Sequence, residues 1–238
     1  MWTVTTFALV PGAGGAAWYW HRVVPLLEQG GHEAVAVDLP GDDPDAGLPE
    51  YAGLVVDAVA GRHDVVVVAQ SMGGFTAPMV AARRPVSAIV LLNAMVPLPG
   101  ETAGQWWGAV GSEEVRLAAA RAGGYTEEVD LDTYFLHDVD PAVAATGEAH
   151  QRPEVDRAFE TPCDISAWPE VPTRAVAGAD DRFFPVALQR RVARERLGLG
   201  LDVVPGGHLA ALSHPAELTA YLCKALPPSG AVRDEQPT

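Results

Sequence analysis

The chain has 238 residues and a formal net charge of −15, a length that fits one domain with a sizeable hydrophobic core. Such an acidic surface repels phosphate groups, so we expect neither nucleic acid nor an anionic membrane as a partner. The first residues lack the basic start of a secretory signal and no apolar run approaches the about 20 residues of a membrane span, so we expect a cytoplasmic protein.

Apolar, β-branched runs alternate with helical patterns along most of the chain. We expect strands at 3–10, 33–39, 64–70 and 87–94, and helices at 18–30, 48–61 and 73–84. The alternation resumes with strands at 173–179 and 201–206 and helices at 185–198 and 214–226. This order predicts an α/β fold in which helices flank both faces of a mostly parallel sheet.

Residues 95–170 break this rhythm with glycine, proline and acidic residues around short amphipathic pieces. We expect an inserted, mainly helical lid over the carboxyl ends of the strands, where open α/β sheets hold their sites. The core is then formed by residues 1–94 and 171–228. The polar residues 229–238 are expected to form a flexible tail.

A glycine-rich turn follows the first strand. Residues 12–17, Gly-Ala-Gly-Gly-Ala-Ala, fit the pattern G-x-G-x-x-A, and Asp38 follows at the distance of a ribose-binding acid, as in a dinucleotide-binding fold. The same turn also supplies backbone N–H groups to an oxyanion in serine hydrolases. The turn alone leaves both alternatives open.

Ser71 stands between a buried strand and a helix in the run Ala-Gln-Ser-Met-Gly-Gly. Small residues two positions away on either side, Ala69 and Gly73, are what the tight turn of a G-x-S-x-G nucleophile motif requires. Such a turn projects the Ser71 hydroxyl above the sheet and directs the Met72 N–H at a developing oxyanion. Serine also begins many ordinary helices, so the motif needs support from elsewhere in the chain.

Two later strands supply that support. The strand at 173–179 ends in the acidic pair Asp180 and Asp181, and the strand at 201–206 ends in glycines followed by His208. The chain order Ser, Asp, His at the ends of successive strands is that of α/β-hydrolases. His214 is better explained as part of a helix start.

The chain resembles the α/β-hydrolase superfamily over nearly its whole length, most closely the small plant-type methylesterase and hydroxynitrile lyase branch. The resemblance rests on residues 9–13, Trp18, Trp20, the Pro-Leu-Leu-Glu run at 25–28 and the pair Asp38-Leu39. Pro11 departs from this pattern, which has histidine before the first glycine. The resemblance implies an α/β-hydrolase fold with a helical lid.

The same resemblance implies the roles of five residues. Ser71 is the expected nucleophile, His208 the base, and the amides of Ala13 and Met72 the oxyanion hole. Asp181 is the expected acid, because the family places an aspartate four residues before a proline.

These residues imply a serine hydrolase that cleaves an ester or thioester of a small apolar substrate through an acyl-enzyme. No cofactor or metal is expected, and Cys163 and Cys223 lack the spacing of a zinc site.

Four alternative functions remain open. They are a lyase, a C–C bond hydrolase, an acyl-transfer or cyclising enzyme with the same triad, and a ligand receptor of this fold. The lyase branch has threonine and lysine where this chain has Gly12 and Leu209.

The expected lid is rich in aromatic residues. Any one of them is best explained as packing of the lid onto the core. Together they favour an apolar substrate pocket over Ser71, in which His137 could donate to a substrate carbonyl. The expected pocket residues are Trp107, Tyr134, Phe135 and His137, with Trp106 beside them.

Overall fold

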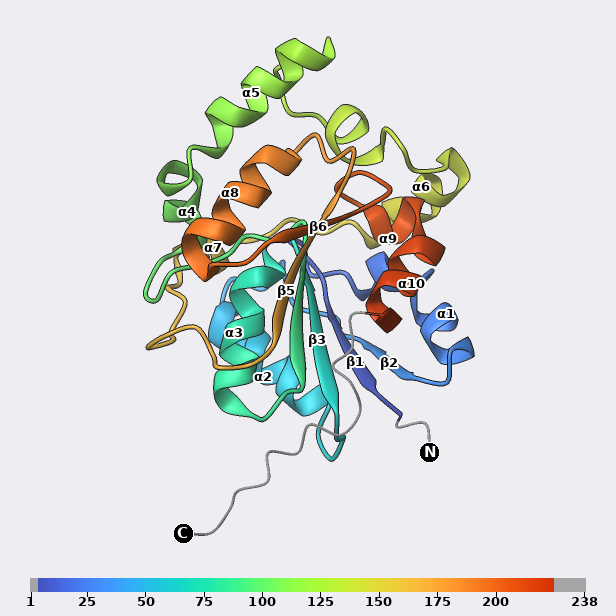
Figure 1. Cartoon of the computed structure of the whole chain (residues 1–238), viewed down its shortest axis with the longest axis vertical. Helices are drawn as coiled ribbons and strands as arrows, with labels where there is room; N and C mark the ends of the chain where they lie inside the picture. Colours follow the sequence, from blue (N-terminus) through green and yellow to red (C-terminus); the bar gives the residue numbers. More distant parts are fainter. Residues whose placement is uncertain (1–3, 225–238) are drawn as a thin grey trace.

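A computed structural model describes residues 4–224, and the expected tail at 229–238 lies outside this range. Six strands form one sheet in the order β2-β1-β3-β4-β5-β6, and every neighbouring pair is parallel (Figure 1). The expected α/β fold class is therefore confirmed. The strands are β1 Thr6–Val10, β2 Glu33–Ala36, β3 Val65–Gln70, β4 Ala88–Leu92, β5 Thr173–Gly178 and β6 Leu201–Val204.

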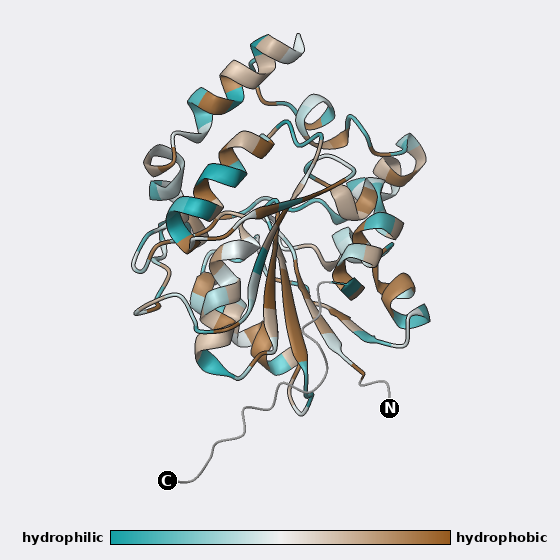
Figure 2. Cartoon of the chain, in the orientation of Figure 1, coloured by the Kyte–Doolittle hydropathy of each residue, from teal (hydrophilic) through white to brown (hydrophobic). Residues whose placement is uncertain are grey.

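Alternate residues of the central strands enter two separate hydrophobic cores. Val65, Val67 and Ala69 of β3 contribute to one core, whereas Val66 and Val68 contribute to the other. Because successive side chains of a strand point to opposite faces, a strand with helices on both faces must be apolar at every position. Figure 2 shows these strands as a continuous hydrophobic centre.

Helices pack on both faces of the sheet. One face carries α2 and α3, and the other carries α1 and α10 (Figure 1). The helices of the core are α1 Val24–Gln29, α2 Leu48–Ala58, α3 Gly73–Arg83, α8 Val186–Leu197, α9 Ala210–Ser213 and α10 Pro215–Lys224.

The expected continuous helix at 18–30 is wrong in one respect. The structure divides it into a 3-10 turn, η1 Ala17–Trp20, and the helix α1, with Pro25 in the first turn of α1. Proline has no N–H to donate and fits the start of a helix better than its interior. The interruption at residues 21–23, just ahead of Pro25, agrees with this preference.

The segment between β4 and β5, hereafter the β4–β5 segment, contains six short elements. These are α4 Ala103–Ala109, α5 Ser112–Gly123, η2 Asp132–Leu136, α6 Pro141–Gly147, η3 Glu148–His150 and α7 Asp156–Glu160. In Figure 1 α5 and α6 lie above the ends of the strands, on the side opposite the N-terminus. The carboxyl ends of parallel strands all lie on one edge, so the segment covers that edge.

Candidate active site

Ser71 occupies the sharp turn between β3 and α3. Its backbone has a φ of +52°, in the left-handed region that a residue with a side chain adopts only at a cost. Ser71 is 9% exposed. A strained turn of this kind lifts a serine hydroxyl out of the sheet and toward the loops.

The glycines after Ser71 are required by close packing. A Cβ at Gly73 would lie 2.5 Å from the Pro11 carbonyl oxygen, and one at Gly74 would collide with the Met95 carbonyl oxygen. Both neighbours are backbone atoms, which a mutant could displace only by moving the loops around Ser71. This explains in physical terms why the motif needs residues without side chains here.

His208 connects the serine to a carboxylate. Its Nε2 lies 3.1 Å from Ser71 Oγ, and its Nδ1 lies 2.9 Å from Asp181 Oδ2. The carboxylate can only accept, so Nδ1 carries the proton and Nε2 presents a lone pair to the serine hydroxyl. Asp180, the other acid of the pair, is exposed. The structure thus brings Ser71, His208 and Asp181 together, from the ends of three different strands.

The Asp181 carboxylate is fixed by three further donors. Its Oδ1 accepts hydrogen bonds from the backbone N–H groups of Phe183 at 2.9 Å and Phe184 at 2.8 Å, while Oδ2 accepts one from Gln189 Nε2 at 3.1 Å. Asp181 is only 5% exposed. Charge-assisted hydrogen bonds on both oxygens compensate for its burial and fix its orientation toward His208.

Asn93, which directly follows β4, holds the histidine loop in place. Its Nδ2 donates to the carbonyl oxygens of Gly207 and His208 at 3.0 Å each, and its Oδ1 accepts from Gly178 N–H at 2.7 Å. Gln70 Nε2 also donates to the His208 carbonyl, at 3.3 Å. Sequence reasoning missed both residues. The available signal was a polar side chain at the carboxyl end of an otherwise apolar strand.

The glycine turn lies beside the serine hydroxyl. A Cβ at Gly12 would lie 3.4 Å from Ser71 Oγ. The Gly12 carbonyl accepts a hydrogen bond from Gly15 N–H at 3.1 Å. In a trans peptide the C=O and N–H groups point in opposite directions, so this bond directs the Ala13 N–H away from Gly15.

The peptide after Ser71 is oriented in the same way. Its carbonyl accepts from Gly74 N–H at 3.1 Å and from Met95 N–H at 2.9 Å, so the Met72 N–H points to the opposite side. Within residues 4–224 the amides of Ala13 and Met72 have no hydrogen-bond acceptor. Two free N–H groups beside a hydroxyl are able to bind an oxygen that gains negative charge.

Comparison with known proteins gives the family. A model described as "Alpha/beta hydrolase family" matches residues 7–220. The chain belongs to the α/β hydrolase family. Among solved structures, polyneuridine aldehyde esterase aligns with a TM-score of 0.75 at 20% identity, covering 93% of this chain and 99% of the other. A pyrethroid hydrolase from Sphingobium faniae aligns with a TM-score of 0.72 at 24% identity, covering 93% and 97%. At such identities the likeness concerns the fold.

Curated relatives of this α/β hydrolase have several names. Norfluorocurarine synthase 1 of a Strychnos species is 33% identical over 104 residues, which cover 38% of this chain and 39% of the relative. Methylesterase 7 of Arabidopsis thaliana is 36% identical over 104 residues, covering 38% and 40%. The chain thus spans about two-fifths of these relatives. A pyrethroid hydrolase of Sphingobium wenxiniae is 25% identical over 242 residues, covering 91% and 85%.

Aromatic rings surround His208 in this α/β hydrolase. Phe135 lies 5.3 Å from the imidazole centroid, and Phe183 and Phe184 lie 5.2 Å from it, all edge to face. Trp107 contacts the rings of Phe183 and Phe184 at 5.5 Å. Sequence reasoning missed the two phenylalanines, although they directly follow the acidic pair. Their apolar surface shields His208 from water.

Two of the expected pocket aromatics pack within the protein instead of facing the imidazole. Tyr134 is fully buried, and its hydroxyl donates to the Thr126 carbonyl at 2.6 Å and accepts from Arg116. Trp106 is also buried, and its indole N–H donates to the Val96 carbonyl at 3.1 Å. Both contacts stabilise the β4–β5 segment.

A mainly apolar cavity of about 310 Å³ opens at the glycine turn. Its walls come from the turn, η1, the β4–β5 segment and the loop after His208, and include Ala13, Trp18, Leu136, Ala144 and Leu209. A cavity of this size holds a small organic group and not a long polymer.

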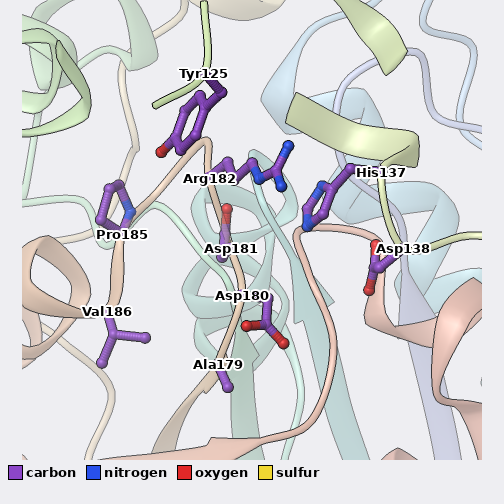
Figure 3. Close-up of a pocket in the computed structure, with 9 residues that line it drawn as sticks. All are labelled: Tyr125, His137, Asp138, Ala179, Asp180, Asp181, Arg182, Pro185 and Val186. Carbon is purple, nitrogen blue, oxygen red and sulfur yellow. The ribbon is translucent and has the colours of Figure 1, made fainter. Parts of the chain in front are cut away.

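A second cavity, of about 350 Å³, is lined by Asp181, Arg182 and His137 among others (Figure 3). The ring of His137 lies between Arg182 and Asp138 in this view. Within the described residues neither ring nitrogen of His137 has a partner, and burial together with the Arg182 charge lowers the pKa of His137. His137 therefore lines the same cavity as Asp181 and is not among the residues that line the apolar cavity.

Residues 4–224 contain no group of three or more His, Cys, Asp or Glu side chains arranged to hold a metal ion. None of the helices that the structure describes is long and apolar enough to span a bilayer.

Proposed function

We propose that this α/β hydrolase is a serine esterase that cleaves an ester or thioester of a small apolar substrate. The observation that carries the proposal is the hydrogen-bonded chain from Ser71 through His208 to Asp181. The free amides of Ala13 and Met72 beside it support the same conclusion. Names of several relatives include esterase or hydrolase, which agrees with this chemistry.

In the proposed reaction, Ser71 Oγ forms a bond to the ester carbonyl carbon while its proton passes to His208 Nε2. The carbonyl oxygen gains negative charge and accepts hydrogen bonds from the Ala13 and Met72 amides. The bond to the alcohol or thiol then breaks, and His208 returns the proton to the leaving group. Asp181 fixes the tautomer and stabilises the imidazolium throughout.

Water completes the cycle. It attacks the acyl carbon, gives a proton to His208, and releases the acid as Ser71 recovers its proton. The apolar cavity at the glycine turn is suited to the apolar part of the substrate. We further propose that residues 95–170 act as a lid on the core that residues 1–94 and 171–228 are expected to form.

A fluorophosphonate probe followed by mass spectrometry tests the proposal. We expect one adduct, on Ser71, together with hydrolysis of activated aryl esters or thioesters. The Ser71→Ala variant should lose the adduct and lower turnover by on the order of 10⁴ or more. Ser87→Ala, a serine outside the site, is the matched control. Undiminished labelling of Ser71→Ala would refute the assignment.

A further inference from the structure

Both backbone groups of Gly14, in the glycine turn, are bound by side chains of the β4–β5 segment. The Gly14 N–H donates to Glu154 Oε2 at 2.6 Å, and its carbonyl accepts from Arg152 Nε at 3.1 Å. The two side chains are two positions apart in an irregular stretch between η3 and α7. The Ala13 N–H belongs to the peptide group between Gly12 and Ala13. Glu154 and Arg152 bind the next two peptide groups along the chain.

Each of these side chains is itself anchored to the core. Arg152 donates two hydrogen bonds to Asp38, at 3.0 Å each, in the bidentate arrangement of guanidinium and carboxylate. Glu154 Oε1 accepts a hydrogen bond from the Tyr51 hydroxyl at 2.5 Å. Asp38 therefore has a protein partner, and the ribose role considered for it is unnecessary.

Close packing leaves the turn little freedom to move. Gly14 has a φ of +82°, and a Cβ on it would lie 2.6 Å from the Arg152 carbonyl oxygen. A Cβ on Gly41 would lie 2.7 Å from the Gly14 carbonyl carbon. Val155 N–H donates to the Gly41 carbonyl at 2.9 Å, which ties the segment to this second glycine.

We infer that Arg152 and Glu154 are positioning residues that hold the glycine turn in the geometry needed to stabilise an oxyanion. The inference rests on the proposed function. The Ala13 and Gly14 peptide planes share one Cα and are related only by φ and ψ of Ala13, so fixing the Gly14 N–H restricts the orientations open to the Ala13 N–H. An amide that must meet a developing charge contributes fully only when its direction is fixed beforehand.

The strength of the Glu154 contact follows from its environment. Glu154 is partly buried, and burial raises its pKa while the hydrogen bonds from Tyr51 and Gly14 lower it. A carboxylate that has lost part of its hydration binds an N–H more strongly than an exposed one does.

Kinetics of four variants test the inference. Glu154→Ala and Arg152→Ala should each lower kcat about tenfold to a hundredfold, less than the loss of an oxyanion donor itself, with little change in KM. Glu154→Gln should recover most of the activity, because its amide oxygen can accept from Gly14 and its NH₂ can donate to the Tyr51 oxygen. Glu160→Gln, an exposed carboxylate of the same segment, is the control.

Two inhibitors separate positioning from general loss of structure. A trifluoromethyl ketone forms a hemiketal oxyanion with Ser71, so its inhibition should weaken in the alanine variants by the same factor as kcat/KM. The unreactive ether analogue of the ester has no carbonyl oxygen and should bind as well as it does to the unmodified protein.

The outcomes distinguish the two proposals. Ser71-dependent hydrolysis with unchanged kcat in both alanine variants overturns the positioning role and leaves the esterase proposal standing. Equal weakening of both inhibitors also overturns it, since the residues would then serve general structure. Failure of the unmodified protein to show any Ser71-dependent hydrolysis refutes the proposed function itself.

Discussion

Gln189, on α8, donates a hydrogen bond to the same oxygen of Asp181 that faces His208. Its amide nitrogen also lies 2.6 Å from the Phe184 carbonyl oxygen, which ties the side chain to the loop between β5 and α8. With the two backbone donors on Oδ1, Asp181 accepts four hydrogen bonds. Its carboxylate can therefore turn only by breaking several of them at once.

Replacement of Asp181 and of its neighbour Asp180 by asparagine should have very different effects on kcat. Asp181→Asn should lower kcat by on the order of 10³–10⁴, because an amide NH₂ opposite Nδ1 favours the wrong imidazole tautomer. Asp180→Asn should stay within about twofold, because Asp180 is exposed and does not contact His208. Steady-state kinetics on one aryl ester measure both. The reverse ranking would move the acid to Asp180.

Removal of the Asn93 side chain should reduce stability strongly. Asn93→Ala leaves Gly178 N–H and the Gly207 and His208 carbonyls without this partner, in a fully buried place. We expect the free energy of unfolding to fall by about 3 kcal/mol or more, since each unsatisfied buried group costs about 1–3 kcal/mol. Urea denaturation measures the change, with the exposed Gln151→Ala as control. A loss below about 1 kcal/mol would contradict the role.

The sheet and the positions of Ser71, Asp181 and His208 at its edge could be predicted because each is indicated by a short, continuous stretch of sequence. Several strands contain four or more consecutive apolar residues, and Ser71, Asp181 and His208 each lie within two residues of the end of a predicted strand. The family model and the sheet topology confirm the predicted α/β hydrolase family and the predicted α/β fold class. Strand ends on one edge of a parallel sheet must meet, so the sequence also predicts which residues are neighbours.

The polar residue at the end of an apolar strand marks Asn93, but its partners and the role of Gln189 could not be predicted, for a physical reason. Asn93 Oδ1 accepts from Gly178 and Gln189, which lie 85 and 96 residues further along the chain, and the sequence contains no pattern that relates them. Gln189 occupies one position of an ordinary amphipathic helix. Arg152 and Glu154 lie in a stretch without periodicity, where only the completed fold determines which loop they meet.

The size of the apolar cavity should decide which esters react. Ala144 of α6 lines the cavity, so Ala144→Leu should raise KM for hexanoate esters several-fold and leave acetate esters within about twofold. Ala145→Leu, the next and exposed residue of the same helix, should change neither. Hydrolysis rates across a series of acyl lengths measure the effect. Equal effects of the two variants would show that the acyl chain binds elsewhere.

The charge of the residue after His208 helps to distinguish a cyanide-releasing lyase from an ester hydrolase. Leu209, which follows His208, lines the apolar cavity and offers no cation to an expelled anion, while the guanidinium of Arg152 in the same wall is paired with Asp38. We expect ester hydrolysis and no release of cyanide from mandelonitrile above background, because an anion leaving into a poorly hydrated pocket needs an electrostatic partner. Colorimetric cyanide detection measures this. Rapid Ser71-dependent cyanide release with inert esters would put the lyase alternative first.

Glu154 should make stability depend on pH in a defined direction. Its pKa is raised by burial, so the folded protein keeps this proton to higher pH than the unfolded chain, and stability decreases as pH rises through the folded pKa. Glu154→Gln removes that cost. It should melt higher than the unmodified protein at pH 7 and equally at about pH 3, where Glu154 is protonated in both the folded and the unfolded state.

Thermal unfolding at the two pH values checks this prediction. Glu160→Gln again serves as the control, since that residue is exposed and lies outside the contact with Gly14. A melting-temperature difference of the same size at both pH values would show that charge on Glu154 is not the cause.

The order of Ser71, Asp181 and His208 along the chain has a consequence for biosynthesis. Ser71 and its strand are complete within the first 94 residues, whereas Asp181 and His208 lie 110 and 137 residues later, beyond the whole β4–β5 segment. A ribosome that has made the nucleophile must therefore add a further 137 residues before both the acid and the base exist. Contacts of such long sequence separation form late in folding. The nascent chain should consequently be inert toward cellular esters until β6 joins the sheet, and the appearance of activity during translation would report completion of the fold.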